Sequence, residues 1–167
     1  MSTHKSLYKY NHTIGMFNLF GRGFYNPVDA ALSSEGVLYV LSRAGSGMAE
    51  GSPKRVTMCT LNGDYLGEFS MGGTDDGMLA WPVSIAVSSD GNVYVSDEFL
   101  NRISVFDKGG HFLDKWGAKG SGDGEFESPS GITFDKDDNL LVVDSVNNRI
   151  QRYTKDGRSL GSWGQGG

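Results

Sequence analysis

The chain has 167 residues, and its 15 Lys and Arg against 20 Asp and Glu give a net charge of -5. This length allows one domain with a sizeable core, and the acidic balance disfavours nucleic acid as a partner. A single cysteine, Cys59, excludes an intramolecular disulfide. Because no segment resembles a signal peptide or a membrane span, we expect a soluble, cytoplasmic protein with no membrane partner.

The first predicted element is an isolated outer strand at residues 5–20. Phe20-Gly21 resembles Trp116-Gly117, and a glycine-containing loop leads from it to Pro27. No sheet precedes this strand in the sequence, so we expect it to complete a sheet elsewhere.

Three copies of one repeat follow, at residues 27–70, 82–117 and 129–164. The stretch "WPVSIAVSSDGNVYVSDEFLNRISVFDKGGHFLDKWG" aligns without a gap to "SPSGITFDKDDNLLVVDSVNNRIQRYTKDGRSLGSWG", 47 residues later. The first copy carries eight extra residues within "RAGSGMAEGSPK". Each copy contains four short runs of alternating apolar residues separated by Gly or Asp turns; in the second copy these lie near 83–88, 92–97, 102–107 and 111–116. Four antiparallel strands repeated at this spacing predict an all-β fold of β-propeller blades.

The third copy resembles an NHL repeat, the blade unit of six-bladed NHL propellers. The resemblance extends from about residue 20, and it is weakest in the first copy, where Ser42 replaces the aspartate and Cys59 the aromatic residue. It implies a ring of six blades closed by an N-terminal strand. Three blades are half of such a ring, and their end faces would expose apolar surface. Either a longer chain or a second copy would supply the other half, and we expect a homodimer, in which residues 5–20 and 158–165 compete for one sheet edge.

The motif Asp97, Asn101, Arg102 recurs as Asp144, Asn148, Arg149. It connects the second and third strands of a copy, which should bring each aspartate and arginine together as a carboxylate–guanidinium bridge. An active site would have no need to occur once per blade. We therefore interpret the motif as a structural joint.

Candidate binding residues lie on the rim that carries the loops between the second and third strands and between blades. Aromatic and arginine side chains there suit contact with a protein or a small polar ligand. The residues are Arg22, Tyr25, Arg43, Lys54, Trp81, Glu98 and Phe99, with Glu125 and Phe126. Packing between blades is the alternative for Trp81 and Phe126. The insertion is either a functional loop or tolerated surface variation.

Metal-dependent catalysis has a thin set of candidate ligands. The resemblance includes amidating lyases that hold zinc with several histidines, and this chain offers His4, His12 and His111. Lactonase-like propellers hold calcium on their inner strands, where this chain has Asp29, Ser84, Ser88, Thr133 and Asp135. The run 135–139 aligns with ordinary hairpin turns and lacks the glycine and glutamate of an EF-hand loop. We expect a non-catalytic scaffold with no zinc or calcium cofactor; the alternative is a metal-dependent lyase or lactonase completed by missing blades or a second chain.

Overall fold

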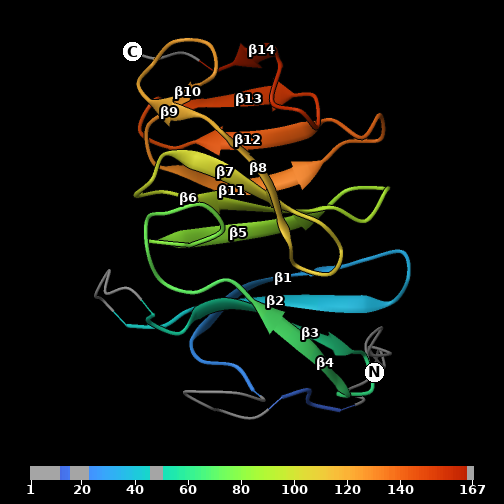
Figure 1. Cartoon of the computed structure of the whole chain (residues 1–167). Helices are drawn as coiled ribbons and strands as arrows, with labels where there is room; N and C mark the ends of the chain where they lie inside the picture. The colour runs from blue at the N-terminus through green and yellow to red at the C-terminus, as the bar shows by residue number, and fades with distance from the viewer. Residues whose placement is uncertain (1–11, 16–22, 46–50, 165–167) are drawn as a thin grey trace, which may run out of the picture.

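The structure, a computed structural model, describes residues 12–15, 23–45 and 51–164. These residues form three four-stranded antiparallel sheets, each with its strands in chain order (Figure 1). Blade one contains β1 (Pro27–Leu32), β2 (Val37–Arg43), β3 (Lys54–Thr60) and β4 (Tyr65–Phe69). Blade two contains β5 (Pro82–Val87), β6 (Val93–Asp97), β7 (Arg102–Phe106) and β8 (Phe112–Trp116). Blade three contains β11 (Pro129–Phe134), β12 (Leu140–Asp144), β13 (Arg149–Tyr153) and β14 (Ser159–Trp163).

The prediction of propeller blades is confirmed, and the strands of blade two lie within one residue of their predicted limits. A short loop sheet, β9 (Ala118–Lys119) with β10 (Glu125–Phe126), connects blades two and three. No helix able to cross a bilayer occurs in the described part of the chain.

Hairpin turns with left-handed residues separate the first two strands of each blade. Gly36 and Gly91 have φ of +82° and +89°, where glycine lacks the steric cost of a Cβ atom. Blade three has Asp138 at the equivalent position with φ of +60°. Its turn is held by Asp135, whose carboxylate accepts from the backbone N–H groups of Asp137 and Asn139 and pairs with Arg152. The stretch 135–139 is therefore a hairpin turn, as its alignment predicts.

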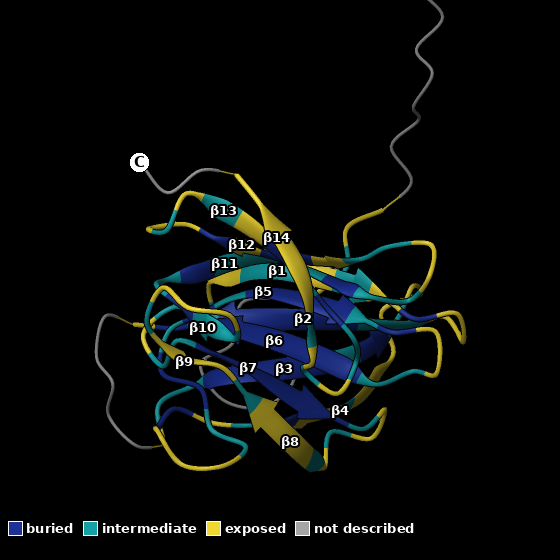
Figure 2. Ribbon diagram, turned by 90° about the horizontal axis from the view of Figure 1, so that it is seen from above, coloured by how far each residue is buried: buried dark blue, intermediate teal, exposed yellow. Residues whose placement is uncertain are grey.

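The core lies between the blades. One apolar cluster joins blades one and two around Tyr39, Leu41, Phe69 and Phe106. The second joins blades two and three and includes Tyr94, Phe126 and Tyr153. Blade two is sandwiched, so β6 and β7 are wholly buried, whereas most of β8 and β14 is exposed (Figure 2).

Polar contacts repeat at the two junctions between blades. The Tyr39 hydroxyl donates to the carbonyl oxygen of Lys108 at 2.9 Å, and the Tyr94 hydroxyl donates to that of Lys155 at 3.2 Å. These tyrosines hold equivalent positions in blades one and two. Each one fastens its own second strand to the outer turn of the next blade.

The inner strands are connected in the same way. The Asp29 carboxylate accepts from the Ser84 hydroxyl at 2.6 Å and from the Ile85 N–H at 2.9 Å. Ser84 occupies in blade two the position of Asp29 in blade one, and its Oγ accepts from the N–H of Ile132 at 3.2 Å. A side chain at this position therefore joins each inner strand to the following one.

Candidate functional site

The joint of blade three contains a buried aspartate surrounded by donors. Asp144 is 0% exposed, and Arg149 Nε lies 2.9 Å from its Oδ2. The same carboxylate accepts from the backbone N–H of Glu127 and from the side-chain amides of Asn147 and Gln151. The predicted carboxylate–guanidinium contact is thus present in this blade.

The joint of blade two is built differently, and the bridge expected between Asp97 and Arg102 is not found among the described residues. Asp97 instead accepts from four backbone N–H groups, those of Ala80, Trp81, Phe99 and Leu100. Arg102 donates to the carbonyl oxygens of Thr74, Asp75 and Met78. Burial lowers the pKa of Arg102, against the attraction of nearby carboxylates.

The arginine of each joint anchors the loop that precedes its blade. Arg149 donates to the carbonyl oxygen of Glu125, Arg102 to that of Met78, and Arg55 to that of Gly23, at 3.1, 3.0 and 3.3 Å. The three acceptors occupy equivalent repeat positions. Asn101 and Asn148 have φ of +52° in both turns, and Asn101 Oδ1 also accepts from the N–H of Ser128. These contacts hold loops in place and present no reactive group to solvent.

Four of the predicted rim residues meet at the junction of blades one and two. The Arg43 guanidinium lies 4.8 Å above the centre of the Trp81 ring, and Lys54 Nζ lies 5.9 Å from it. Arg43 also pairs with Glu98 at 3.9 Å. We call Arg43, Lys54, Trp81 and Glu98 the rim cluster. Strand pairing positions Arg43 beside Lys54, while Trp81 lies in the loop before β5 and Glu98 in the turn between β6 and β7.

The electrostatics of the rim cluster are set by unequal burial. Lys54 is 0% exposed, and desolvation lowers the pKa of its ammonium group, with the Asp97 carboxylate acting in the opposite direction. Its Nζ lies 3.4 Å from Ser52 Oγ. The side chains of Arg43 and Glu98 keep 28% and 35% of their surface. A ligand at this rim would therefore meet the arginine, the glutamate and the half-buried indole, with Lys54 beneath them.

The other predicted rim residues have different surroundings. Phe99 is 51% exposed beside Glu98, and its N–H is held by Asp97. Tyr25 is half-buried and precedes Asn26, which exchanges hydrogen bonds with the backbone of Arg43. Phe126 is fully buried between Trp116 and Tyr153, so it packs between blades, and Glu125 bonds to the N–H of Gly122. Arg22 and insertion residues 46–50 lie outside the described residues.

The candidate metal ligands are dispersed. His12 contacts the carbonyl oxygen of Leu61, His111 pairs with Asp107 at the other end of an outer turn, and His4 lies outside the described residues. No group of three or more His, Cys, Asp or Glu side chains within the described ranges could hold a metal ion.

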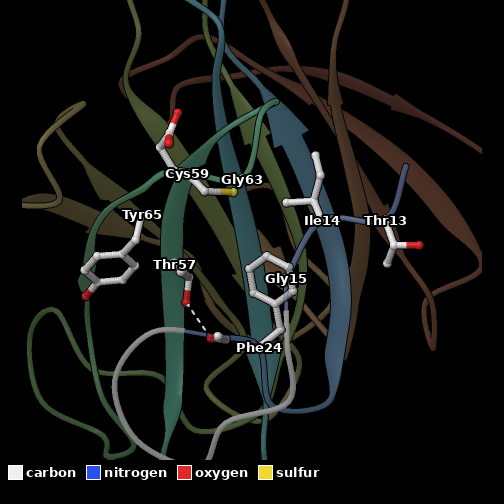
Figure 3. Close-up of a pocket in the computed structure, with 10 residues that line it drawn as sticks. Thr13, Ile14, Gly15, Phe24, Thr57, Cys59, Gly63 and Tyr65 are labelled. Carbon is white, nitrogen blue, oxygen red and sulfur yellow. Dashed lines mark hydrogen bonds between the residues drawn. The ribbon is translucent and has the colours of Figure 1, made fainter. Parts of the chain in front are cut away.

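The structure also contains two cavities that the sequence did not predict. One, of about 680 Å³, is lined by the inner strands β1, β5 and β11, including Asp29, Ser84 and Thr133. The other, of about 650 Å³, lies between residues 13–15 and the outer strands of blade one (Figure 3). Phe24, Thr57 and Tyr65 line it, and the Thr57 hydroxyl donates to the carbonyl oxygen of Gly23 at 3.5 Å.

A family model described as a 6-bladed beta-propeller matches residues 73–162. No curated protein matches the chain. Similar solved structures include virginiamycin B lyase from Staphylococcus aureus, with 19% identity, a TM-score of 0.60, and coverage of 85% of this chain and 42% of that one. Hydrazine synthase from Kuenenia stuttgartiensis is 20% identical with a TM-score of 0.60, and the match covers 86% of this chain and 38% of that one. Regucalcin, a calcium-binding protein from Agrobacterium tumefaciens, is 17% identical with a TM-score of 0.59, and the match covers 82% of this chain and 44% of that one.

This chain spans less than half the length of each of these structures. At such low identity the similarity establishes the fold alone.

Proposed function

Since the chain belongs to the 6-bladed beta-propeller family, whose model covers more than half of it, we propose that it is a non-catalytic binding scaffold of the NHL type. It presents the rim cluster to a protein or a small polar ligand in the cytoplasm. Its ring is completed by self-association. The observation that carries the proposal is the convergence of Arg43, Trp81 and Glu98 beside the exposed ring of Phe99.

The chemistry of this surface suits binding. Trp and Arg are among the residues most enriched in the hot spots of binding surfaces, and a cation over an indole is held without losing its outward donors. The Arg43–Glu98 contact is long at 3.9 Å and partly exposed, so a ligand carboxylate can replace Glu98 as the partner of Arg43 at little cost. Phe99 adds an apolar contact whose burial would stabilise a complex.

Peptides selected from a random display library on the intact protein test the proposal. We expect the main class of selected peptides to lose affinity by about tenfold or more when Phe99→Ser or Arg43→Ala is introduced. Leu32→Ser is the matched control, because the exposed fraction of Leu32 is 52% and that of Phe99 is 51%. Leu32 lies at the last position of β1, at the end of that strand away from the rim. Peptides that respond to Leu32→Ser and ignore both rim variants would contradict the rim assignment.

A second candidate function is a metal-dependent lyase or a lactonase-like hydrolase. The cavity of about 680 Å³ on the inner strands favours it, because Asp29 and Ser84 lie there at 2.6 Å and further blades or a second chain could add ligands. Two of the similar structures are named as a lyase and as a calcium-binding protein. Elemental analysis of the purified protein separates the two functions: stoichiometric zinc or calcium that survives dialysis would overturn the scaffold.

A further inference from the structure

The outward face of blade three has an unfilled place. Val143, Ile150 and Trp163 are 39%, 37% and 52% exposed there. A cavity of about 350 Å³ is lined by Ile150, Trp163 and Gly164 at the end of β14, together with residues of the blade-three joint.

At the two interior junctions the equivalent place is filled by an apolar residue three positions before an inner-strand proline. Phe126 precedes Pro129 in this way, and a Cβ atom on Gly117 would lie 2.6 Å from its ring. Leu79 precedes Pro82 and is fully buried with Phe69 in the core between blades one and two. In this chain one more large apolar residue has that spacing. It is Phe24, three positions before Pro27.

A second contact accompanies the first: the last aromatic residue of an outer strand covers a turn glycine of the next blade. Phe69 covers Gly110, and Trp116 covers Gly157, so closely that a Cβ atom on either glycine would lie 2.3 or 2.5 Å from the ring. Gly63 is the equivalent glycine of blade one.

Gly63 is covered in this structure by Ile14 of the same chain, whose Cγ2 lies 4.0 Å from a Cβ placed there. Gly15 follows and packs against Phe24 (Figure 3), in the same way that Gly117 packs against Phe126. Ile14-Gly15 therefore occupies on blade one the place that Trp116-Gly117 occupies on blade three. The sequence alignment assigns this position to Phe20-Gly21, which lies outside the described residues.

Isoleucine fills that place incompletely. The cavity of about 650 Å³ is lined by Ile14, Phe24 and Gly63 and reaches Cys59 and Tyr65. The indole of a tryptophan has a larger surface than the isoleucine side chain. At the junction of blades two and three the residue at this position is a tryptophan, Trp116. Blade one therefore has room for a tryptophan over Gly63.

The tyrosine that donates a hydrogen bond between blades has no equivalent on the outward face of blade three. Leu141 stands in blade three where Tyr39 and Tyr94 stand in the other blades. It would face Leu61 of blade one, which stands at the position of Lys108 and Lys155, where the acceptor is the backbone carbonyl oxygen. A junction of blade three with blade one would therefore lack the tyrosine hydrogen bond, and in the single chain the Leu61 carbonyl oxygen lies 2.8 Å from His12 Nε2.

The inner strands show the same correspondence. Gly131 of blade three has no side chain to offer an acceptor, unlike Asp29 and Ser84. The donor it would serve on blade one is the N–H of Ala30, which already bonds to Asp29 Oδ1 at 2.8 Å. Docking blade three on blade one would therefore not leave the Ala30 N–H without a partner.

We propose that blade three of one copy docks on blade one of a second copy, with Trp163-Gly164 over Gly63 and against Phe24, in place of that copy's own Ile14-Gly15. The inference rests on the proposed self-association and identifies its contacts. Intrachain cover by Ile14 and docking of a second chain are then alternatives at one site. A substitution that weakens the cover of Gly63 by Ile14 should therefore strengthen the association of two copies. A substitution of Trp163 should weaken that association.

Sedimentation velocity of the full chain, across a wide range of concentration, tests the competition through variants of opposite sign. Trp163→Ser removes the docking side chain, and we expect the dissociation constant to rise at least about tenfold. His12→Ala removes the contact of His12 with the Leu61 carbonyl oxygen, 2.8 Å away, and should lower the dissociation constant. His111→Ala is the control, since that exposed histidine lies in the outer turn of blade two and should change nothing.

Both variant residues are exposed in the single chain, so the fold should tolerate each change, and circular dichroism checks this. A dimer that responds to neither variant would overturn the docking geometry while leaving self-association intact. A chain that remains monomeric throughout would overturn both, without affecting binding at the rim cluster.

Discussion

Replacing Arg149 by alanine removes three interactions from the joint of blade three. The guanidinium loses its contact with Asp144 at 2.9 Å and its bonds to the carbonyl oxygens of Gly122 and Glu125 at 2.8 and 3.1 Å. Hydrogen bonds to charged groups contribute about 1.5–3 kcal/mol each. The loss is smaller than their sum, because Asp144 keeps three other donors and water can reach an arginine that is 13% exposed. We expect the free energy of unfolding to fall by about 2–4 kcal/mol.

Blade two supplies the control. Arg102→Ala also removes three interactions, but all three are bonds to carbonyl oxygens, and Asp97 keeps all four of its backbone donors. A double-mutant cycle of Asp144→Asn with Arg149→Ala should therefore give a coupling energy of about 1.5–3 kcal/mol, and the cycle of Asp97→Asn with Arg102→Ala less than about 1 kcal/mol. Urea denaturation followed by circular dichroism measures both, with unchanged m-values as the condition for comparison. Equal couplings in the two blades would refute the assignment of different partners.

Two further predictions concern the junctions between blades. Burial raises the pKa of Tyr94 and of Tyr153 to about 12 in the folded state, from an ordinary value near 10. Their stabilisation is therefore complete below pH 10 and is lost as the pH rises toward 12, by about 2–3 kcal/mol for each tyrosine. Tyr94→Phe should flatten this decline in the urea midpoint, and an unchanged slope would count against it. Gly157→Ala should cost about 2–4 kcal/mol because its Cβ would lie 2.5 Å from Trp116, whereas Gly36→Ala, with a similar φ and no atom within 4 Å, should cost only about 1 kcal/mol. Equal losses of melting temperature in these two variants would contradict the close packing of Trp116.

The blades could be predicted from the sequence because each strand is indicated by a local pattern of residues. The alternation of apolar residues at period 2 and the turn glycines can be recognised without reference to distant residues. The gapless alignment of the second and third copies shows the same pattern twice. The rim cluster was predictable only as a set of residues on one side. That Arg43 lies over Trp81, 38 positions away, depends on how blade two is rotated against blade one, which no local pattern encodes.

The different partners of Asp97 and Asp144 arise from neighbours that the alignment treats as interchangeable. Asn147 and Gln151 direct side-chain amides at Asp144, whereas the equivalent residues of blade two are Leu100 and Ser104. Without those amides, Asp97 is satisfied by backbone N–H groups of the two adjoining loops. The backbone pairing is the same, since Asp97 opposes Arg102 as Asp144 opposes Arg149. Sequence register therefore predicts the proximity of two residues, while the bond each makes is decided by competing donors nearby.

Blade one shows which part of the joint the fold requires. Its arginine, Arg55, still donates to the loop carbonyl oxygen of Gly23, although Ser42 stands where the other blades have aspartate. The Ser42 hydroxyl is buried, and it has no hydrogen-bond partner among the described residues. Within the described part of the chain, the Ser42 side chain therefore makes none of the contacts by which the carboxylates of Asp97 and Asp144 hold the loop before their blade. Arg43 follows Ser42 directly and carries the guanidinium over Trp81. The blade in which Ser42 replaces the joint aspartate is thus also the blade that contributes Arg43 and Lys54 to the rim cluster.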